Sequence, residues 1–183
     1  EKYNIKATFY PVIGYCKERK IAPLDYYYQY VNNNIGKGQK KDWITGRKKK
    51  DFITLSIHQQ KKFLKTLLKI KRPKKEVSYM SIKQLQELDS LNHEIGGHSM
   101  YHDIYTQLSE NEVLLDIQQT KHLLSGIGID ISSYAYTDGK YDSTIISALK
   151  NESIKYACAI KSKKLTKHVN LELERKFITE NIE

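Results

Sequence analysis

Residues 92–102 read Asn-His-Glu-Ile-Gly-Gly-His-Ser-Met-Tyr-His, and they carry two histidines four residues apart, His98 and His102. Two imidazoles at this spacing can reach one metal ion from a helix or a tight loop, and histidine is the commonest protein ligand of divalent metal ions. The pair therefore predicts a metal site. The alternative is a loop pair that is hydrogen-bonded to the backbone.

The residues before the pair predict where it lies in the fold. Ser81 is a good N-cap, and apolar residues follow it at helical spacing, at Ile82, Leu85, Leu88 and Leu91. His93 to Gly97 then reads as a short strand that runs into a loop. We therefore expect both histidines at the carboxyl end of a strand, where α/β folds usually place their chemistry.

Strands and helices alternate in the second half of the chain. A capping box formed by Ser109 and Glu112 opens a helix that we expect to end at Gly126. A strand over 131–136, a helix over 143–149 and a buried strand over 156–160 follow. Repeated strand-then-helix units indicate parallel neighbours, so the sequence predicts an α/β fold.

Three segments of the chain resemble the polysaccharide deacetylase family, also described as NodB-homology domains or family 4 carbohydrate esterases. His98-Ser-Met-Tyr-His102 is similar to the second family motif. Ser133-Tyr-Ala-Tyr-Thr-Asp-Gly-Lys-Tyr-Asp142 is similar to the third motif in its Ala-Tyr-Pro-Tyr-Gly form, and Tyr3-Asn-Ile-Lys-Ala-Thr-Phe-Tyr10 resembles the second strand of the family barrel. The resemblance covers about residues 1–20 and 78–160.

The resemblance implies a distorted (β/α) barrel of the NodB type that lacks its first strand. It also implies that His98 and His102 bind Zn²⁺ or a similar divalent metal ion. Such an ion polarises an acetamide carbonyl and activates the water that attacks it. The expected activity is a hydrolase that releases acetate from N-acetylated sugars of a cell-envelope or exported polymer, which favours a periplasmic or extracellular location.

Two departures from the family pattern bear on this expectation. Family members carry a Thr-Phe-Asp-Asp motif, which supplies the general base and the third metal ligand, and this chain does not contain it. We expect it upstream in a longer protein; the other interpretation is that the chain has lost the acid. In the third motif Thr137 and Asp138 replace Pro and Tyr. The resemblance implies that the backbone N–H of Asp138 stabilises the oxyanion, although a carboxylate there is unfavourable.

Three further residues are candidates for the site. By resemblance, His168 is the candidate general acid that protonates the leaving amine, and Arg175, in Leu173-Glu-Arg-Lys-Phe177, would bind or tune an acid near the site. Tyr136 could line the sugar groove, because aromatic rings pack against pyranose faces. The alternatives are a loop histidine for His168 and a core residue for Tyr136.

The charge of the chain is concentrated in one segment. The formal net charge is +10, and residues 37–75 contain 15 Lys and Arg against two acids. We interpret residues 21–77 as a basic helical insertion in a single domain that spans 1–183. It could face solvent, or it could bind an anionic surface such as an acidic polysaccharide through its lysines, among them Lys48, Lys49, Lys50, Lys61, Lys62 and Lys65.

Two other functions remain open at this point. The chain could be a non-catalytic deacetylase-like domain that binds glycan or another anionic surface. It could also be a basic protein that associates with nucleic acid, although no recognised nucleic-acid motif accompanies the charge. No run in the sequence approaches the ~18 apolar residues of a membrane span.

Overall fold

The computed structural model describes residues 5–18, 21–68 and 79–176. The chain divides into two compact units, one formed by Glu1–Lys17 together with Met80–Glu183 and the other by Glu18–Tyr79. The second unit covers the segment that carries the excess positive charge. That it is an insertion in one deacetylase-like domain stays a prediction.

The first unit is built on short parallel strands. β1 pairs with β2, and β3, β4 and β5 form a second sheet in that order, all in parallel register. A parallel bridge from Gly97 to Tyr134 joins the two sheets. The strands are β1 (Thr8–Phe9), β2 (Glu94–Ile95), β3 (Ser133–Ala135), β4 (Tyr156–Ala159) and β5 (Leu173–Glu174).

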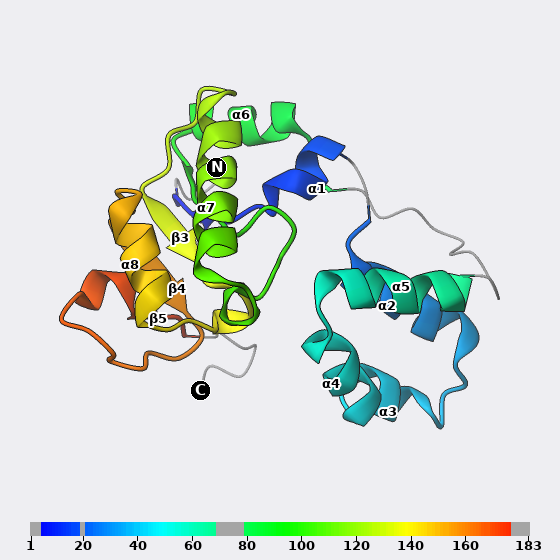
Figure 1. Ribbon diagram of the computed structural model, residues 1–183. Helices are drawn as coiled ribbons and strands as arrows, with labels where there is room; N and C mark the ends of the chain where they lie inside the picture. Colours follow the sequence, from blue (N-terminus) through cyan, green and yellow to red (C-terminus); the bar gives the residue numbers. More distant parts are fainter. Residues whose placement is uncertain (1–4, 19–20, 69–78, 177–183) are drawn as a thin grey trace, which may run out of the picture. The chain divides into compact units, whose positions relative to one another are not determined.

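Helices connect these strands, as the alternating pattern predicts (Figure 1). They are α1 (Ile13–Glu18), α6 (Ile82–Ser90), α7 (Glu110–Ser125) and α8 (Ser143–Asn151), with 3₁₀ turns η1 (Tyr105–Gln107), η2 (Thr137–Gly139) and η3 (Val169–Leu171). Ser109 and Glu112 form the predicted capping box of α7, and Ser81 forms a second one with Gln84 on α6. The sequence signals for helix starts are thus confirmed.

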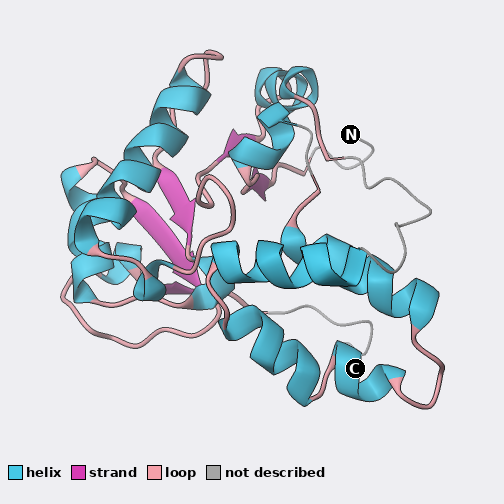
Figure 2. Cartoon of the chain, turned by 45° about the vertical axis from the view of Figure 1, so that its right-hand side comes forward, coloured by secondary structure: helices cyan, strands magenta, loops and turns pink. Residues whose placement is uncertain are grey.

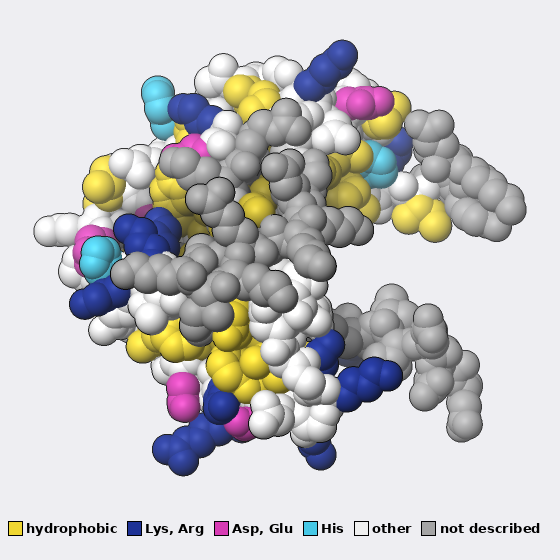
Figure 3. Space-filling view, turned by 90° about the vertical axis from the view of Figure 1, so that its right-hand side faces the viewer, with side chains coloured by type: hydrophobic (Ala, Val, Ile, Leu, Met, Phe, Trp, Pro, Cys, Tyr) yellow, Lys and Arg dark blue, Asp and Glu magenta, His cyan; other side chains and the backbone are white. Residues whose placement is uncertain are grey.

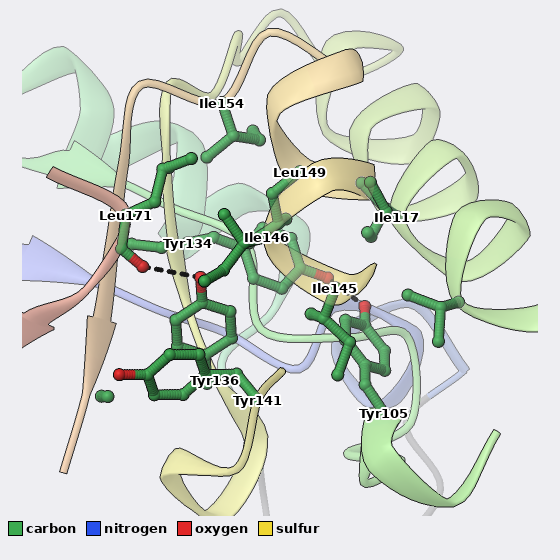
Figure 4. Packing of buried hydrophobic residues seen from close by; sticks show 14 residues of the cluster. Tyr105, Ile117, Tyr134, Tyr136, Tyr141, Ile145, Ile146, Leu149, Ile154 and Leu171 are labelled. Atoms are coloured by element: carbon green, nitrogen blue, oxygen red, sulfur yellow. Dashed lines mark hydrogen bonds between the residues drawn. The ribbon is translucent and has the colours of Figure 1, made fainter. Parts of the chain in front are cut away.

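The main core lies between the second sheet and the helices α7 and α8. Because strand residues alternate between faces, Tyr134, Tyr136, Ala157 and Ala159 all point to the helix side. They pack there against Ile117 of α7 and against α8 residues that include Ile145, Ile146 and Leu149 (Figure 4). A second cluster, which includes Ile13, Leu85, Ile95 and Leu124, covers the helix side of β2.

The opposite face of the second sheet is more open. Cys158 lies on this face and is half-buried, and its register partner Leu173 is 40% exposed. Tyr156, two residues before Cys158, is 47% exposed. The α/β class is confirmed, whereas in the described residues the strands form two small sheets joined by one bridge. A closed barrel therefore stays a prediction.

The second unit is helical (Figure 2). Its helices are α2 (Pro23–Asn34), α3 (Lys40–Ile44), α4 (Arg47–Thr54) and α5 (Ile57–Leu68). Tyr27, Val31, Phe52 and Leu64 form its buried core, in which the rings of Tyr27 and Phe52 stack with centroids 4.5 Å apart. In the described parts of both units, no helix is long and apolar enough to cross a membrane.

The core of the first unit can be tested on α7. Ile117 is fully buried between α7 and α8, so Ile117→Ala should lower the free energy of unfolding by about 2–5 kcal/mol through lost burial and the cavity left behind. Leu115, two residues away on the same helix, is 54% exposed, and Leu115→Ala should change it by less than about 0.5 kcal/mol. Denaturant unfolding measures both. Equal effects of the two substitutions would contradict the described packing of α7.

Candidate functional site

A pocket of about 410 Å³ opens at the carboxyl ends of the strands. His98 follows the bridge that extends β2, Asp138 follows β3, Ile160 directly follows β4, and Arg175 directly follows β5. Four parallel strands thus bring residues far apart in sequence to one place. The complete lining is His98, His102, Asp138, Ile160, Arg175 and Lys176.

The position of His98 depends on a close approach of two backbones. Gly97 N–H donates to Ser133 O at 2.9 Å, and Ala135 N–H donates to Gly97 O at 2.8 Å. A Cβ on Gly97 would lie 2.2 Å from a ring carbon of Tyr134, so this crossing requires glycine. The next residue, His98, is thereby placed beside the end of β3.

The imidazole of His98 has a defined tautomer. Its Nδ1 lies 2.7 Å from the carbonyl oxygen of Ala135, and because a carbonyl can only accept, Nδ1 carries the proton. Burial lowers the pKa of His98 to about 4, although the Ala135 carbonyl acts in the opposite direction. The ring is therefore neutral at pH 7, and Nε2 keeps its lone pair. This is the state in which histidine binds a metal ion.

His102 lies beside His98 in the same pocket. The two ring centroids are 5.0 Å apart and the rings meet edge to face. His102 has φ +65°, a left-handed conformation that is uncommon for a residue with a side chain. Such strain tends to occur where function requires it.

The two histidines fit two positions of a metal site. In the ranges that the structure describes, no group of three or more His, Cys, Asp or Glu residues is placed to hold one ion. A complete site of the tetrahedral kind that zinc prefers needs at least one more protein ligand.

Hydrogen bonds to Ser99 hold the loop between the histidines. Ser99 is fully buried, and its N–H donates to the hydroxyl of Tyr134 at 2.9 Å. Its Oγ accepts from the N–H of Asp103 at 3.0 Å and from that of Tyr101 at 3.3 Å. The serine of the second motif therefore shapes the loop.

Asp116 of α7 supports the same loop from behind. Its carboxylate accepts from the N–H of Met100 at 3.1 Å and from the hydroxyl of Tyr105 at 2.6 Å. The Tyr105 hydroxyl is also hydrogen-bonded to that of Tyr134 (Figure 4). Burial raises the pKa of Asp116, and the hydrogen bonds from Tyr105 and Met100 offset part of that rise.

Sequence reasoning missed Asp116, although a signal was present. The buried residues Val113, Ile117, Thr120 and Leu124 define the inner face of α7, and Asp116 lies next to Ile117 at helical spacing from Val113 and Thr120. An acid on the inner face of an amphipathic helix indicates a buried polar partner.

Two predicted residues, Asp138 and Arg175, do line the pocket. Asp138 lies in η2 with φ +52°, and its side chain is exposed. The N–H of Arg175 donates to Ala159 O at 2.9 Å, which fixes the backbone of Arg175 beside β4. The roles predicted for these two residues stay predictions.

The other two predicted residues do not line the pocket. Tyr136 is fully buried, stacks on Tyr141 with centroids 4.4 Å apart, and donates its hydroxyl to Leu171 O at 2.7 Å (Figure 4). It is a core residue that leaves no ring surface for a sugar. The exposed His168 lies with its Nε2 3.2 Å from Lys150 Nζ and is not part of the pocket lining.

Comparison with known proteins gives one family match. The family model described as "Polysaccharide deacetylase" matches residues 1–157. No curated protein sequence matches the chain.

Several solved structures are also similar. PplD, a Streptococcus pyogenes deacetylase, is 17% identical with a TM-score of 0.45, over 47% of this chain and 38% of that one. IcaB of Ammonifex degensii is 17% identical with a TM-score of 0.48, over 56% and 49%. A family 4 carbohydrate esterase of Streptomyces lividans is 17% identical with a TM-score of 0.40, over 42% and 40%. The chain thus spans less than half the length of each of these proteins.

The support that Asp116 gives to the loop can be measured. Asp116→Ala leaves the Met100 N–H and the Tyr105 hydroxyl without their acceptor, so the free energy of unfolding should fall by about 1–3 kcal/mol. Asp130 is exposed, and Asp130→Ala should change it by less than about 0.5 kcal/mol. Thermal and denaturant unfolding compare the two variants. An Asp116 variant as stable as the Asp130 control would show that the loop does not depend on this carboxylate.

The protonation state of His98 can be measured in the metal-free protein. Burial lowers the pKa of His98 to about 4, so the NMR signals of its ring should shift only when the pH is lowered to near 4. In the urea-unfolded chain the same ring should titrate near the usual value of about 6.5. Since the unfolded state binds the proton more tightly, this contribution to stability is complete above about pH 6.5 and is lost as the pH falls towards 4. A folded-state titration near 6.5 would contradict the described burial of the ring.

Proposed function

The chain belongs to the polysaccharide deacetylase family, and on that basis we propose that it carries the histidine part of a metal-dependent hydrolase that removes acetyl groups from N-acetylated sugars. The observation that carries the proposal is the pocket at the strand ends. There the ring of His98 is neutral, its Nδ1–H donates to the Ala135 carbonyl, and its Nε2 carries a lone pair. His102 lies beside it.

The proposed cofactor is a divalent metal ion, Zn²⁺ in the first instance. When bound, such an ion polarises the acetamide carbonyl and lowers the pKa of a coordinated water. His98, through Nε2, and His102 would hold it, and the Ala135 carbonyl fixes the orientation of the His98 ring. By resemblance, an aspartate of the Thr-Phe-Asp-Asp motif would complete the ligand set and a second one would act as base.

Two other pocket residues, Arg175 and Asp138, have proposed roles. The guanidinium of Arg175 is a permanent cation, and it would hold an acidic group or the polar face of the substrate near the histidines. By resemblance to the family, the backbone N–H of Asp138 would donate to the developing oxyanion. The overall reaction converts an acetamide and water to acetate and an amine.

The proposed substrate and location follow from the family. We take the substrate to be an N-acetylated, or less readily an O-acetylated, sugar in an envelope or exported polymer. The corresponding location is periplasmic or extracellular.

One observation favours a second, non-catalytic function. Asp138 brings a carboxylate to the pocket at the position where the family motif has a tyrosine, and a negative charge beside a developing oxyanion raises the barrier of the reaction. A deacetylase-like domain that binds glycan without hydrolysing it would tolerate this residue. The two functions differ in whether acetate is released.

A zinc titration by calorimetry tests the metal site. We expect one ion per chain, and at least about a tenfold loss of affinity in His98→Ala, because a nitrogen ligand disappears. His122→Ala is the matched control: His122 is an exposed histidine of α7 outside the pocket, and its substitution should leave the affinity unchanged. Binding that is equally strong in all three proteins would contradict the proposed site.

Acetate release then separates the two functions. The longest form of the protein that its gene encodes, loaded with zinc, should release acetate from N-acetylglucosamine oligomers, and His98→Ala should abolish the release while His122→Ala retains it. Zinc and oligomer binding without acetate release would support the non-catalytic function instead.

A further inference from the structure

A second pocket, of about 660 Å³, lies on the helical unit around α3 and the start of α4. It contains two lysines, one acid, one indole and several hydrogen-bonding groups. Its lining is Gly38, Gln39, Lys41, Asp42, Trp43, Thr45, Gly46 and Lys48. None of the residues proposed for the metal site belongs to it.

Trp43 is held in this pocket by the aromatic core of the unit. Its ring lies 6.0 Å from that of Tyr27 and 6.0 Å from that of Tyr30, and its carbonyl oxygen accepts the hydroxyl of Tyr27 at 2.9 Å. The indole is half-buried and still lines the pocket. A tryptophan fixed on one side and open on another can pack against an amphipathic ligand such as a sugar.

Lys48 is held in place by the same indole. Its ammonium lies 4.3 Å from the ring centroid of Trp43, a cation–π distance. This contact fixes a long, otherwise mobile side chain at the pocket before any ligand binds. Ordering a lysine in advance lowers the entropy cost of binding an anion.

The acid in the pocket already has a partner. Asp42 Oδ1 accepts from the N–H of Arg47 at 3.0 Å, at the first residue of α4. The Asp42 carboxylate is therefore engaged at the start of α4. Around the pocket, residues 37–65 contain ten Lys and Arg against two acids, so the surrounding field is positive.

Many of the described lysine and arginine side chains are exposed. On the face drawn in Figure 3, lysine and arginine side chains project along the lower margin beside a patch of hydrophobic side chains. Lys41 and Lys48 are both exposed. An anion in solution can therefore reach both of them.

We propose that this pocket binds an acidic glycan, with a carboxylate or phosphate of the sugar chain between Lys41 and Lys48. The indole edge of Trp43 would pack against a sugar ring, and Gln39 and Thr45 would meet its hydroxyls. The inference rests on the proposed function, since it adds a polymer-binding site to a polysaccharide deacetylase. It favours glycan over nucleic acid, because single-stranded nucleic acids use several successive stacking platforms and this pocket has one indole.

Intrinsic fluorescence gives a direct test, because Trp43 is the only tryptophan in the sequence. Titration of the whole chain with polygalacturonate should give a saturable change in tryptophan emission that weakens as salt is added. Dextran, a neutral polysaccharide, should give none. A missing response to polygalacturonate, or an equal response to dextran, would overturn the proposal.

Two double variants that remove the same charge distinguish binding at the pocket from general electrostatic attraction. Lys41→Gln/Lys48→Gln should weaken polygalacturonate binding at least about tenfold through the loss of two charge-assisted contacts. Lys61→Gln/Lys62→Gln removes the same charge from α5, outside the pocket, and should have a much smaller effect. Equal losses in the two variants would mean general attraction and no site. Circular dichroism confirms that both variants are folded.

Two further readouts keep the outcomes distinct. If single-stranded DNA binds as tightly as polygalacturonate with the same lysine dependence, the pocket is a nucleic-acid site and the proposal is wrong. Zinc affinity, which depends on His98, should be the same in both lysine variants. Failure of the deacetylase proposal would appear in zinc binding or acetate release, whereas failure of this proposal appears in tryptophan emission.

Discussion

The candidate site depends on one backbone crossing, at Gly97. There the two sheets are joined by a single parallel bridge, and only a residue without Cβ can lie against the ring of Tyr134. The crossing places His98 beside the end of β3, where the Ala135 carbonyl accepts a hydrogen bond from Nδ1–H and leaves the lone pair of Nε2 available. The approach of Gly97 to β3 therefore determines the position of His98 in the pocket, the tautomer of its ring and its low pKa. Hydrogen bonds to Ser99 and Asp116 then hold the loop beyond His98, and this loop places the ring of His102 beside that of His98.

Local signals in the sequence predicted much of this arrangement. Capping serines, apolar periodicity and the alternation of strands and helices can be read along the chain, and they predicted α6, α7, the parallel pairing and the carboxyl-end position of His98. Long-range contacts were not predictable in the same way. A strand tyrosine such as Tyr136 is more often a core residue than a groove residue, but only the stacking on Tyr141 shows which of the two it is. The place of His168 depends on the path of the loop after β4, and the role of Asp116 depends on which loop packs against α7.

The two units use charge differently. In the first, the half-buried carboxylate of Asp116 accepts hydrogen bonds from two specific partners, the Met100 N–H and the Tyr105 hydroxyl. In the second, a small core built largely from aromatic rings carries lysines on its outside, with Lys48 over Trp43 and Lys49 5.3 Å from the ring centroid of Tyr28. Cation–π contacts let an aromatic core present cations in fixed positions without acidic partners. Such a surface suits a polyanion better than it suits a neutral ligand.

We infer that the Ala135 carbonyl, by accepting Nδ1–H, leaves Nε2 as the atom of His98 that binds a metal ion. Long-range ¹H–¹⁵N NMR of the histidine rings, recorded before and after addition of one equivalent of zinc, identifies the protonated and the metal-bound nitrogen. Without metal, His98 should be the Nδ1–H tautomer, and zinc should shift the Nε2 resonances of His98 while Nδ1 stays protonated. A metal-free ring protonated on Nε2, or zinc bound through Nδ1, would contradict it.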